Sequence, residues 1–316
     1  MLPALKGLCW EAFIQSNFRK EIHSMSHALV GGIGGSGLYL MDALQDAQEQ
    51  MLQTPFGAPS DAVVTGRVNG VPVAFLARHG RGHRLLPFEV PYRANIHAMK
   101  QLGVRYLLSV SAVGSLREDF KPLDMVLPDQ FIDLTKRRES TFFGQGAVAH
   151  VSMAQPVCPA ASGVLARAVR KVLALEAPGH GVTLHEGGTY VCIEGPQFSS
   201  QAESNWYRGM GGGVIGMTNM PEAKLAREAQ MAYATLALVT DFDCWHPREA
   251  HVTAGMALAN LFKNASRAQQ VVAEAVALLG AELPASDAHS ALKDALVTQP
   301  DAMAPEVRAR LAALLG

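Results

Sequence analysis

Two aspartates, Asp241 and Asp243, follow the strongly apolar stretch at residues 231–239. If this stretch is a β-strand, side chains at alternate positions project to one side, so the two carboxyl groups lie close together. Like charges at short range raise the pKa of at least one carboxyl group, which suits a proton donor. Two solvated loop carboxylates would fit the same pattern, and these residues alone do not decide between the two interpretations.

A second set of residues carries hydrogen-bond donors that suit a tetrahedral anion. Arginine offers a planar fork for phosphate oxygens, and a histidine beside it can donate one more hydrogen bond. A hydroxyl among the backbone N–H groups of a glycine-rich loop forms a further concave donor set. Six such positions end four inferred strands: Ser36, Arg78, His79, Ser111, Ala112 through its backbone N–H, and Thr218. A bound anion explains their convergence better than chance does.

The glycine-rich loop at residues 31–37 has the spacing G-x-G-x-x-G, through Gly32, Gly34 and Gly37. A dinucleotide site would need a helix directly after it and an acidic residue at the end of the next strand, about 20 residues later. Neither condition is met cleanly. A plain turn and a phosphate loop both remain open, and the hydroxyl of Ser36 favours the phosphate.

Two other kinds of site fit the sequence less well. The run Arg78-His79-Gly80 resembles the R-H-G motif of the histidine phosphatases, in which the histidine becomes phosphorylated. That family carries the motif on its first strand, whereas two inferred strands and a glycine loop precede it here. The pair His79 and His83, like the histidines after Asp241, matches no zinc-binding spacing, and no cysteine supports one. We therefore expect no metal.

The loop at residues 194–199 turns an inferred strand into a helix. Ser199 or Ser200 stands where it could cap that helix, and capping is the simpler role. Phe198 lies in the same strand-end loop, where an aromatic ring could stack on a flat base.

The elements that position these residues alternate between strand and helix. Short apolar runs bounded by glycine, proline and charge indicate strands that are buried on both faces. Helical patterns cover residues 91–102, 162–175, 199–209, 221–233 and 253–279, and the tail suggests two short helices. This order predicts an α/β fold with a mostly parallel or mixed sheet, in which ligands bind beyond the carboxyl ends of the strands.

Composition favours a protein that acts on a small molecule. The 316 residues include 27 Lys and Arg against 28 Asp and Glu, so charge gives no case for nucleic acid or an anionic membrane. No apolar run is long enough to span a membrane. The four cysteines are widely separated and form no C-x-x-C pair, which fits a reducing, cytoplasmic location.

One large domain is the simplest organisation for a chain of this length. Residues 1–24 are an N-terminal extension or a misplaced start, because the first strand opens naturally after Met25. The predicted domain covers residues 25–283, and residues 284–316 form a C-terminal helical extension.

Taken in order, the segments GGSGL, ARHGRGH, SAVGSL, EGPQFSS, MTNMPEA and TDFDCW resemble the methylthioadenosine phosphorylase branch of the purine nucleoside phosphorylases. The resemblance runs from about Ala28 to about Asn264. It implies a single-domain, twisted mixed sheet that is partly closed and flanked by helices, and a homotrimer. It also implies cleavage of a purine nucleoside by inorganic phosphate, with no cofactor.

The resemblance also assigns roles to individual residues. Phosphate is expected at the six donor positions named above. Met217 is expected against the ribose, Phe198 beside the base, and Asp241 and Asp243 on the purine. His150 is expected near the 5′ group of the substrate in a neighbouring subunit.

The mechanism and the choice of base follow from these parts. A protonated Asp241 can donate to N7 of the departing purine. The oxopurine enzymes of the family carry asparagine at the position of Asp241 and glutamate at that of Ser199. Both positions therefore favour a 6-aminopurine. The leading substrate is 5′-methylthioadenosine, with methylthioinosine, adenosine and inosine as alternatives. A nucleotide-binding protein without catalysis is a further alternative.

Overall fold

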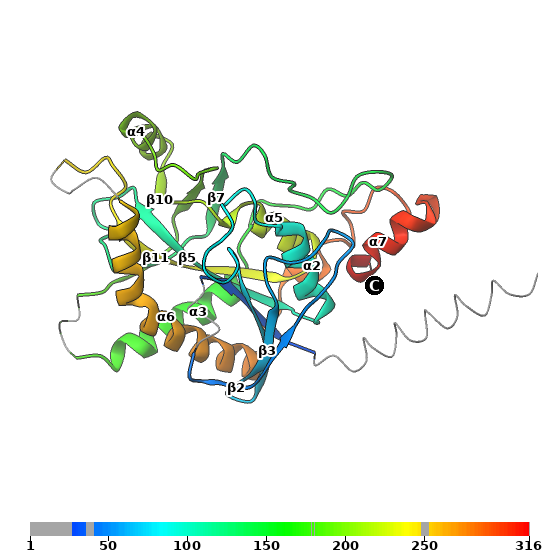
Figure 1. Ribbon diagram of the computed structural model, residues 1–316, viewed down its shortest axis with the longest axis horizontal. Coiled ribbons are helices and arrows are strands. Elements are labelled where there is room, and N and C mark those ends of the chain that lie inside the picture. The colour runs from blue at the N-terminus through cyan, green and yellow to red at the C-terminus, as the bar shows by residue number, and fades with distance from the viewer. Residues whose placement is uncertain (1–26, 36–40, 178, 180, 248–252, 316) are drawn as a thin grey trace, which may run out of the picture.

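Parallel strands from both halves of the chain form the centre of one sheet (Figure 1). In the computed structural model, β1 (Val30–Gly34) lies between β4 (Val71–Ala77) and β5 (Tyr106–Ser115) and runs parallel to both. The next long strand, β11 (Ala232–Asp241), is parallel to β5. All residues of β1 and β11 are buried, which accounts for their continuous apolar character. The structure describes residues 27–35, 41–177, 179, 181–247 and 253–315.

Shorter strands extend the sheet to both sides. They are β2 (Leu44–Gln50), β3 (Val63–Val68), β6 (Met125–Leu127), β7 (Gln130–Asp133), β8 (Leu184–Glu186), β9 (Thr189–Cys192) and β10 (Gly212–Gly216). The main path runs β2-β3-β4-β1-β5-β10-β9-β7, and β11, β6 and β8 branch from β5. In the described part of the chain this path ends at β2 and β7, which do not pair. The mixed α/β sheet is confirmed, but it is open rather than partly closed.

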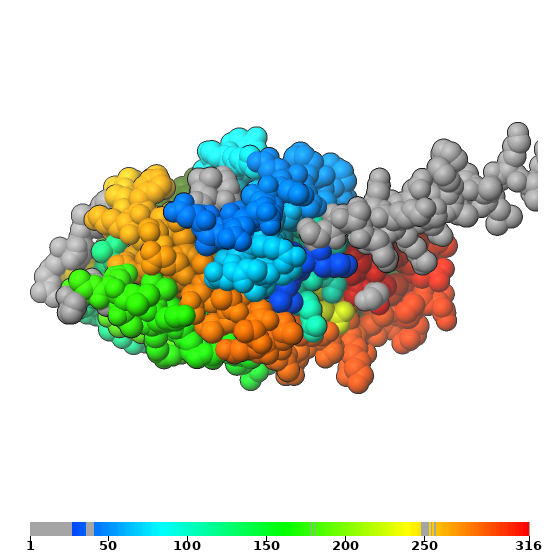
Figure 2. All heavy atoms as spheres, turned by 90° about the horizontal axis from the view of Figure 1, so that it is seen from below, coloured from blue at the N-terminus to red at the C-terminus, as the bar shows by residue number. Residues whose placement is uncertain are grey.

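Helices cover both faces of the sheet. On one face, α3 (Pro159–Ala174) and α6 (Ala254–Glu282) pack side by side, as the green and orange atoms of Figure 2 show. On the other face lie α2 (Tyr92–Gln101), α5 (Asn219–Glu228) and α7 (Pro305–Leu315). The short helix α4 (Gln201–Gly209) lies at the edge near β10.

The C-terminal segment completes the core on the face covered by α2 and α5. Leu292, Met303, Val307, Leu311 and Leu314 are buried in the same cluster as the apolar side chains of those two helices. Two short 3₁₀ turns, Asp287–Ser290 and Pro300–Ala302, lead into α7. The tail therefore forms one α-helix, where the sequence suggested two.

Two other sequence-based predictions need correction. The helix predicted at residues 221–233 ends at Glu228, because Gln230 adopts a left-handed conformation with φ 58° and β11 begins two residues later. The strand β2 was not expected at all. It is a polar edge strand with an exposed centre, so it lacks the apolar run that marks a buried strand. No helix of the described residues is both long and apolar enough to cross a membrane.

Candidate active site

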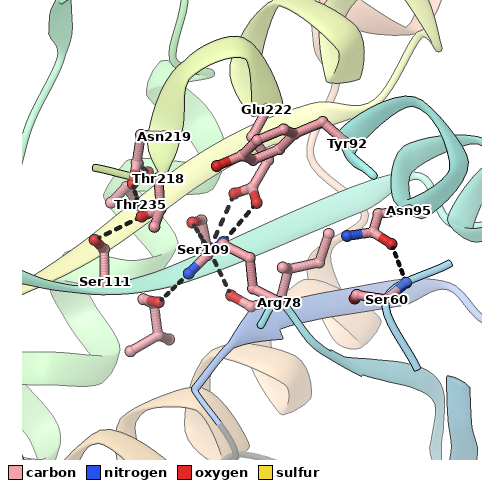
Figure 3. Close-up of polar contacts among 12 residues, drawn as sticks. Ser60, Arg78, Tyr92, Asn95, Ser109, Ser111, Thr218, Asn219, Glu222 and Thr235 are labelled. Atoms are coloured by element: carbon pink, nitrogen blue, oxygen red, sulfur yellow. Dashed lines mark hydrogen bonds and ion pairs between the residues drawn. The ribbon is translucent and has the colours of Figure 1, made fainter. Parts of the chain in front are cut away.

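Three of the predicted anion ligands, Arg78, Ser111 and Thr218, lie near one another in Figure 3. Arg78 and His79 follow β4, Ser111 and Ala112 lie in the middle of β5, and Thr218 follows β10. Ser36 falls outside the described residues. The structure thus brings together residues that are up to 140 positions apart in the sequence.

Arg78 is buried in a dense set of acceptors. Its Nε and Nη2 atoms lie 2.8 and 3.1 Å from the two carboxylate oxygens of Glu222. The same guanidinium donates to the Ser109 hydroxyl and to the carbonyls of Ile33 and Val110. Burial opposes its charge, but Glu222 raises the Arg78 pKa above its ordinary value. One hydrogen of Nη1 has no acceptor among the described residues, so a single N–H is left for a ligand.

His79 is held as a neutral ring. Its Nδ1 lies 2.9 Å from the carbonyl oxygen of Leu85, which can only accept, so Nδ1 carries the hydrogen. Burial and the neighbouring charge of Arg78 lower the His79 pKa to about 4. In the neutral ring, Nε2 is an acceptor. In this tautomer the one ring N–H serves Leu85, so a contact between His79 and an anion would run through Nε2; the role of His79 at the anion stays a prediction.

Two hydroxyls from different strands lie side by side. The Oγ of Ser111 is 3.1 Å from the Oγ1 of Thr218, and both side chains are buried. The same Ser111 oxygen is 3.1 Å from the phenol oxygen of Tyr190. Ala112, the next residue of β5, is exposed. This cluster is the strongest concentration of neutral donors among the predicted anion ligands.

The two aspartates are buried, but not in the geometry that the sequence predicted. β11 ends at Asp241, and Asp243 adopts a left-handed conformation with φ 52°. The chain turns back so that the Asp243 N–H donates to Oδ1 of Asp241 at 2.8 Å. The Thr240 hydroxyl is 2.7 Å from Oδ2 of Asp241. Each carboxyl oxygen of Asp241 thus accepts a hydrogen bond from a residue close to it in the sequence.

Burial is the main reason that the pKa of each aspartate is raised, whereas the repulsion between them contributes little to Asp241 and is not among the causes for Asp243. The hydroxyls of Ser199 and Ser204 lie close to Asp243 and favour its charged form. Neither hydroxyl forms a well-aligned hydrogen bond within the described structure. A ligand with both donors and acceptors would satisfy this group.

In the loop before α4, the residue that caps the helix is Ser200 and not Ser199. Ser200 is the N-cap, and its hydroxyl and the Glu203 carboxylate form a reciprocal capping box. Ser199 therefore does not cap the helix. Its carbonyl accepts a hydrogen bond from the Cys244 thiol at 3.2 Å. Phe198 is 44% exposed. Its ring is available at the surface beside this loop.

The backbones of Met217 and His150 form hydrogen bonds with residues from other parts of the chain. Met217 is half-buried, and its carbonyl accepts from Nη1 of Arg138 at 2.7 Å. A side chain at Gly195 would come within 2.5 Å of the Met217 sulfur, so the glycine makes room for it. His150 is exposed, and its N–H donates to the carbonyl of Ala295 in the C-terminal segment.

Sequence reasoning missed a buried arginine that joins three loops. Arg138 pairs with Glu194 at 2.8 Å, and its side chain is only 1% exposed. It donates to the Tyr92 hydroxyl and to the carbonyls at residues 193, 194, 217 and 220. The Glu194 carboxylate in turn accepts from two backbone N–H groups at residues 136 and 137. We call Arg138 and Glu194 the loop clamp.

The missed residues carry no local signal. Glu222 lies 144 residues from its partner Arg78, and Arg138 lies 56 residues from Glu194. Tyr190 stands inside an apolar strand, where a tyrosine is usually a core residue. Only their position between predicted strand ends could have indicated them. No group of three or more His, Cys, Asp or Glu in the described ranges is arranged to hold a metal ion.

A buried acid at the end of β11, with anion donors on β5 and in the segments after β4 and β10, defines a class of protein, and comparison with known proteins agrees with it. Residues 29–277 match the family model of the phosphorylase superfamily, so the chain belongs to this superfamily.

Within the superfamily the chain is similar to S-methyl-5′-thioadenosine phosphorylases. It is 59% identical to that of a Synechocystis strain over 95% of this chain and 91% of the relative. It is also 59% identical to that of Thermosynechococcus vestitus, over 91% of this chain and 98% of the relative. A methylthioadenosine phosphorylase structure from an Antarctic soil metagenomic library is 61% identical, with a TM-score of 0.87 over 92% of this chain and 100% of that one.

Proposed function

We propose that the protein transfers the 5-methylthioribosyl group of 5′-methylthioadenosine to inorganic phosphate, releasing adenine and 5-methylthioribose 1-phosphate. It is a pentosyltransferase of the purine nucleoside phosphorylase type that acts in purine and methionine salvage. The observation that carries this function is a buried acid on β11 beside the donor cluster of β5, in a chain that matches such phosphorylases over almost its full length.

The spacing of acid and donors supports a nucleoside between them. Asp241 pairs with Gly114, and its Oδ1 lies 2.9 Å from where a side chain at Gly114 would begin, so the glycine leaves room for the carboxyl group. Ser111 lies three residues earlier on β5. At the usual rise of a strand, this separates the phosphate donors from the acid by about 10 Å.

In the proposed mechanism, the bond between the sugar and N9 lengthens before phosphate attacks. Negative charge then develops on the purine, and protonated Asp241 donates to N7. Phosphate is bound by Ser36, Arg78, Ser111, the Ala112 N–H and Thr218. His79 Nε2 accepts the one O–H of hydrogen phosphate rather than donating to it. No covalent enzyme intermediate is needed, and configuration at the anomeric carbon inverts.

The remaining roles are proposed on the same basis. Met217 packs against the sugar and Phe198 beside the base, while Asp243 and Ser199 bind the polar edge of the purine. No cofactor or metal takes part, and phosphate is the co-substrate. Dialysis against a chelator should leave turnover unchanged; loss of activity that a metal restores would contradict this.

We further propose that the protein is a cytoplasmic homotrimer. Family resemblance supports the trimer, and the exposed position of His150 would allow it to reach a neighbouring substrate. The free, buried thiols of Cys158, Cys192 and Cys244 support a reducing compartment. We retain residues 25–283 as the nucleoside phosphorylase domain, with residues 1–24 as an N-terminal extension or a misplaced start and residues 284–316 as a C-terminal helical extension. Light scattering on the purified protein tests the trimer, which a monomeric mass would contradict.

Four nucleosides test the function. The protein is incubated with methylthioadenosine, methylthioinosine, adenosine and inosine, with and without phosphate, and base release is followed. We expect phosphate-dependent release that is fastest with methylthioadenosine. Faster turnover of the inosine compounds would overturn the aminopurine assignment. Release without phosphate would indicate a hydrolase, and binding without release would indicate a nucleotide-binding protein. A phosphohistidine trapped at His79 would indicate a phosphatase instead.

A further inference from the structure

Tyr190 makes a polar contact that its surroundings do not require. It lies on β9, is fully buried, and packs its ring against Phe131 with 5.7 Å between ring centres. Its hydroxyl does not end in an apolar pocket. Instead it lies 3.1 Å from the Oγ of Ser111, which is itself 3.1 Å from the Oγ1 of Thr218. The strands β9 and β5 and the segment after β10 thus contribute one hydroxyl each to a group of three, in which Tyr190 interacts with both Ser111 and Thr218.

The backbone leaves a space that admits this phenol. β9 and β10 are parallel neighbours, and Gly216 is the last residue of β10. A side-chain carbon at Gly216 would lie 1.9 Å from the Tyr190 oxygen and 2.6 Å from the ring carbon that bears it. The hydroxyl therefore reaches Ser111 only because residue 216 is glycine. Thr218 follows two residues later, so the same strand end admits the tyrosine and carries one of its partners.

The number of hydroxyl hydrogens in this group determines how many hydrogen bonds it can donate to a bound anion. Ser111 and Thr218 have one hydroxyl hydrogen each, and the Ser111 oxygen is also 3.3 Å from the carbonyl of Ala112. Two hydroxyls left alone can satisfy each other, which withdraws one hydrogen from any anion. A third hydroxyl that donates to Ser111 gives that oxygen a hydrogen bond without Thr218, so the hydrogens of Ser111 and Thr218 can turn toward a ligand. Burial raises the pKa of Tyr190 to about 12, so the phenol keeps its hydrogen across the neutral range.

We propose that Tyr190 is a positioning residue for phosphate. It donates to Ser111 and thereby directs the Ser111 and Thr218 hydrogens toward the bound anion. This inference rests on the proposed function, because it assumes that phosphate binds at Ser111 and Thr218. In this proposal Tyr190 acts through the two smaller hydroxyls and does not bind phosphate itself.

The test replaces the hydroxyl and keeps the ring. In Tyr190→Phe we expect the KM for phosphate to rise about 5- to 10-fold, the effect of one hydrogen bond. The KM for the nucleoside should stay within about twofold. The shift in melting temperature that phosphate produces should shrink accordingly. Tyr106→Phe is the matched control, because Tyr106 is equally buried and its hydroxyl donates to the carbonyl of Pro284, away from the site.

A double-mutant cycle separates positioning from a general packing role. If Tyr190 acts through Ser111, then Tyr190→Phe should add little to the rise in phosphate KM already caused by Ser111→Ala. Additive effects, or equal rises in the KM for phosphate and nucleoside, would overturn the proposal. Wild-type protein that shows no phosphate-dependent turnover would refute the proposed function itself. Normal wild-type turnover with an unchanged phosphate KM in Tyr190→Phe would refute only the role of Tyr190.

Discussion

At the scale of single residues, the site depends on burial more than on repulsion between charges. The sequence suggested that like charges at alternate positions raise the pKa of at least one of the two carboxyl groups; in the structure the pKa of each is raised mainly by burial. Asp241 and Asp243 are 6% and 5% exposed, and removal from water favours the neutral acid in each. A buried acid can therefore remain protonated next to a ligand without needing a second negative charge.

The first prediction concerns Asp241→Asn. Asparagine preserves the shape but cannot donate an acidic proton to N7, so kcat with methylthioadenosine should fall about 100- to 1,000-fold. The loss with inosine analogues should be much smaller, because the asparagine amide can donate to O6. Steady-state rates on both substrates measure the difference. Equal losses on the two would show that Asp241 contributes only to structure or general electrostatics.

A second prediction concerns pH. The pKa of Asp241 is raised, so its protonated form persists above the usual range of an aspartate and disappears as pH increases. At saturating substrates, kcat should therefore fall on the alkaline side of that pKa. The Asp241→Asn variant should lose this limb, since an amide does not titrate. A rate that rises with pH over the same interval would contradict the role of the protonated acid.

At the scale of elements, the ends of strands could be predicted from the sequence, but the side-chain contacts that connect them could not. Arg78 and Thr218 could be placed from the sequence because apolar strands have recognisable ends, whereas Ser111 lies inside β5. Glu222, Arg138 and Tyr190 could not, because each acts on a residue far away in the chain. For the fold, buried strands and long helices were found by their patterns. The edge strand β2 was missed because its exposed polar residues resemble a loop.

The loop clamp leads to a third prediction. Arg138→Lys keeps the charge but loses the fork that reaches six backbone and side-chain oxygens. The loop that carries Met217 should then shift, and kcat/KM for the nucleoside should fall about 10- to 100-fold. Phosphate should still raise the melting temperature.

Arg137→Lys is the matched control for the clamp. The Arg137 side chain is exposed over the ring of Phe88, and only its backbone N–H contacts Glu194. Activity of the control should remain near wild type. If both variants lose activity equally, or neither does, the clamp does not position the sugar site.

At the scale of the whole molecule, helices cover both faces of the sheet, and the proposed site lies where β4, β10 and β11 end. The layer formed by α2, α5 and α7 also buries a histidine that the proposed reaction does not use. His97 is 2% exposed, lies against the rings of Phe56 and Phe142, and neither ring nitrogen forms a well-aligned hydrogen bond with the described residues. Burial lowers its pKa from 6.5 to about 4.

The fourth prediction follows from this lowered pKa. Between pH 6.5 and 4 the unfolded chain binds a proton at His97 that the folded chain does not, so stability must decrease as pH falls through this window. At pH 5 this one group costs about 2 kcal/mol of unfolding free energy relative to pH 7.5. Urea unfolding at both pH values should show a smaller difference for His97→Phe than for wild type. An unchanged difference would mean that His97 is protonated in the folded state.

The C-terminal segment affects when the native core can be completed during synthesis. Its side chains from Leu292 to Leu314 complete the cluster that supports α2 and α5, and its backbone pairs with the strand-like stretch before His150. These residues follow every residue of the proposed site in the sequence. During synthesis, a nascent chain that already carries the whole site therefore still exposes part of its apolar core until this segment has emerged as well.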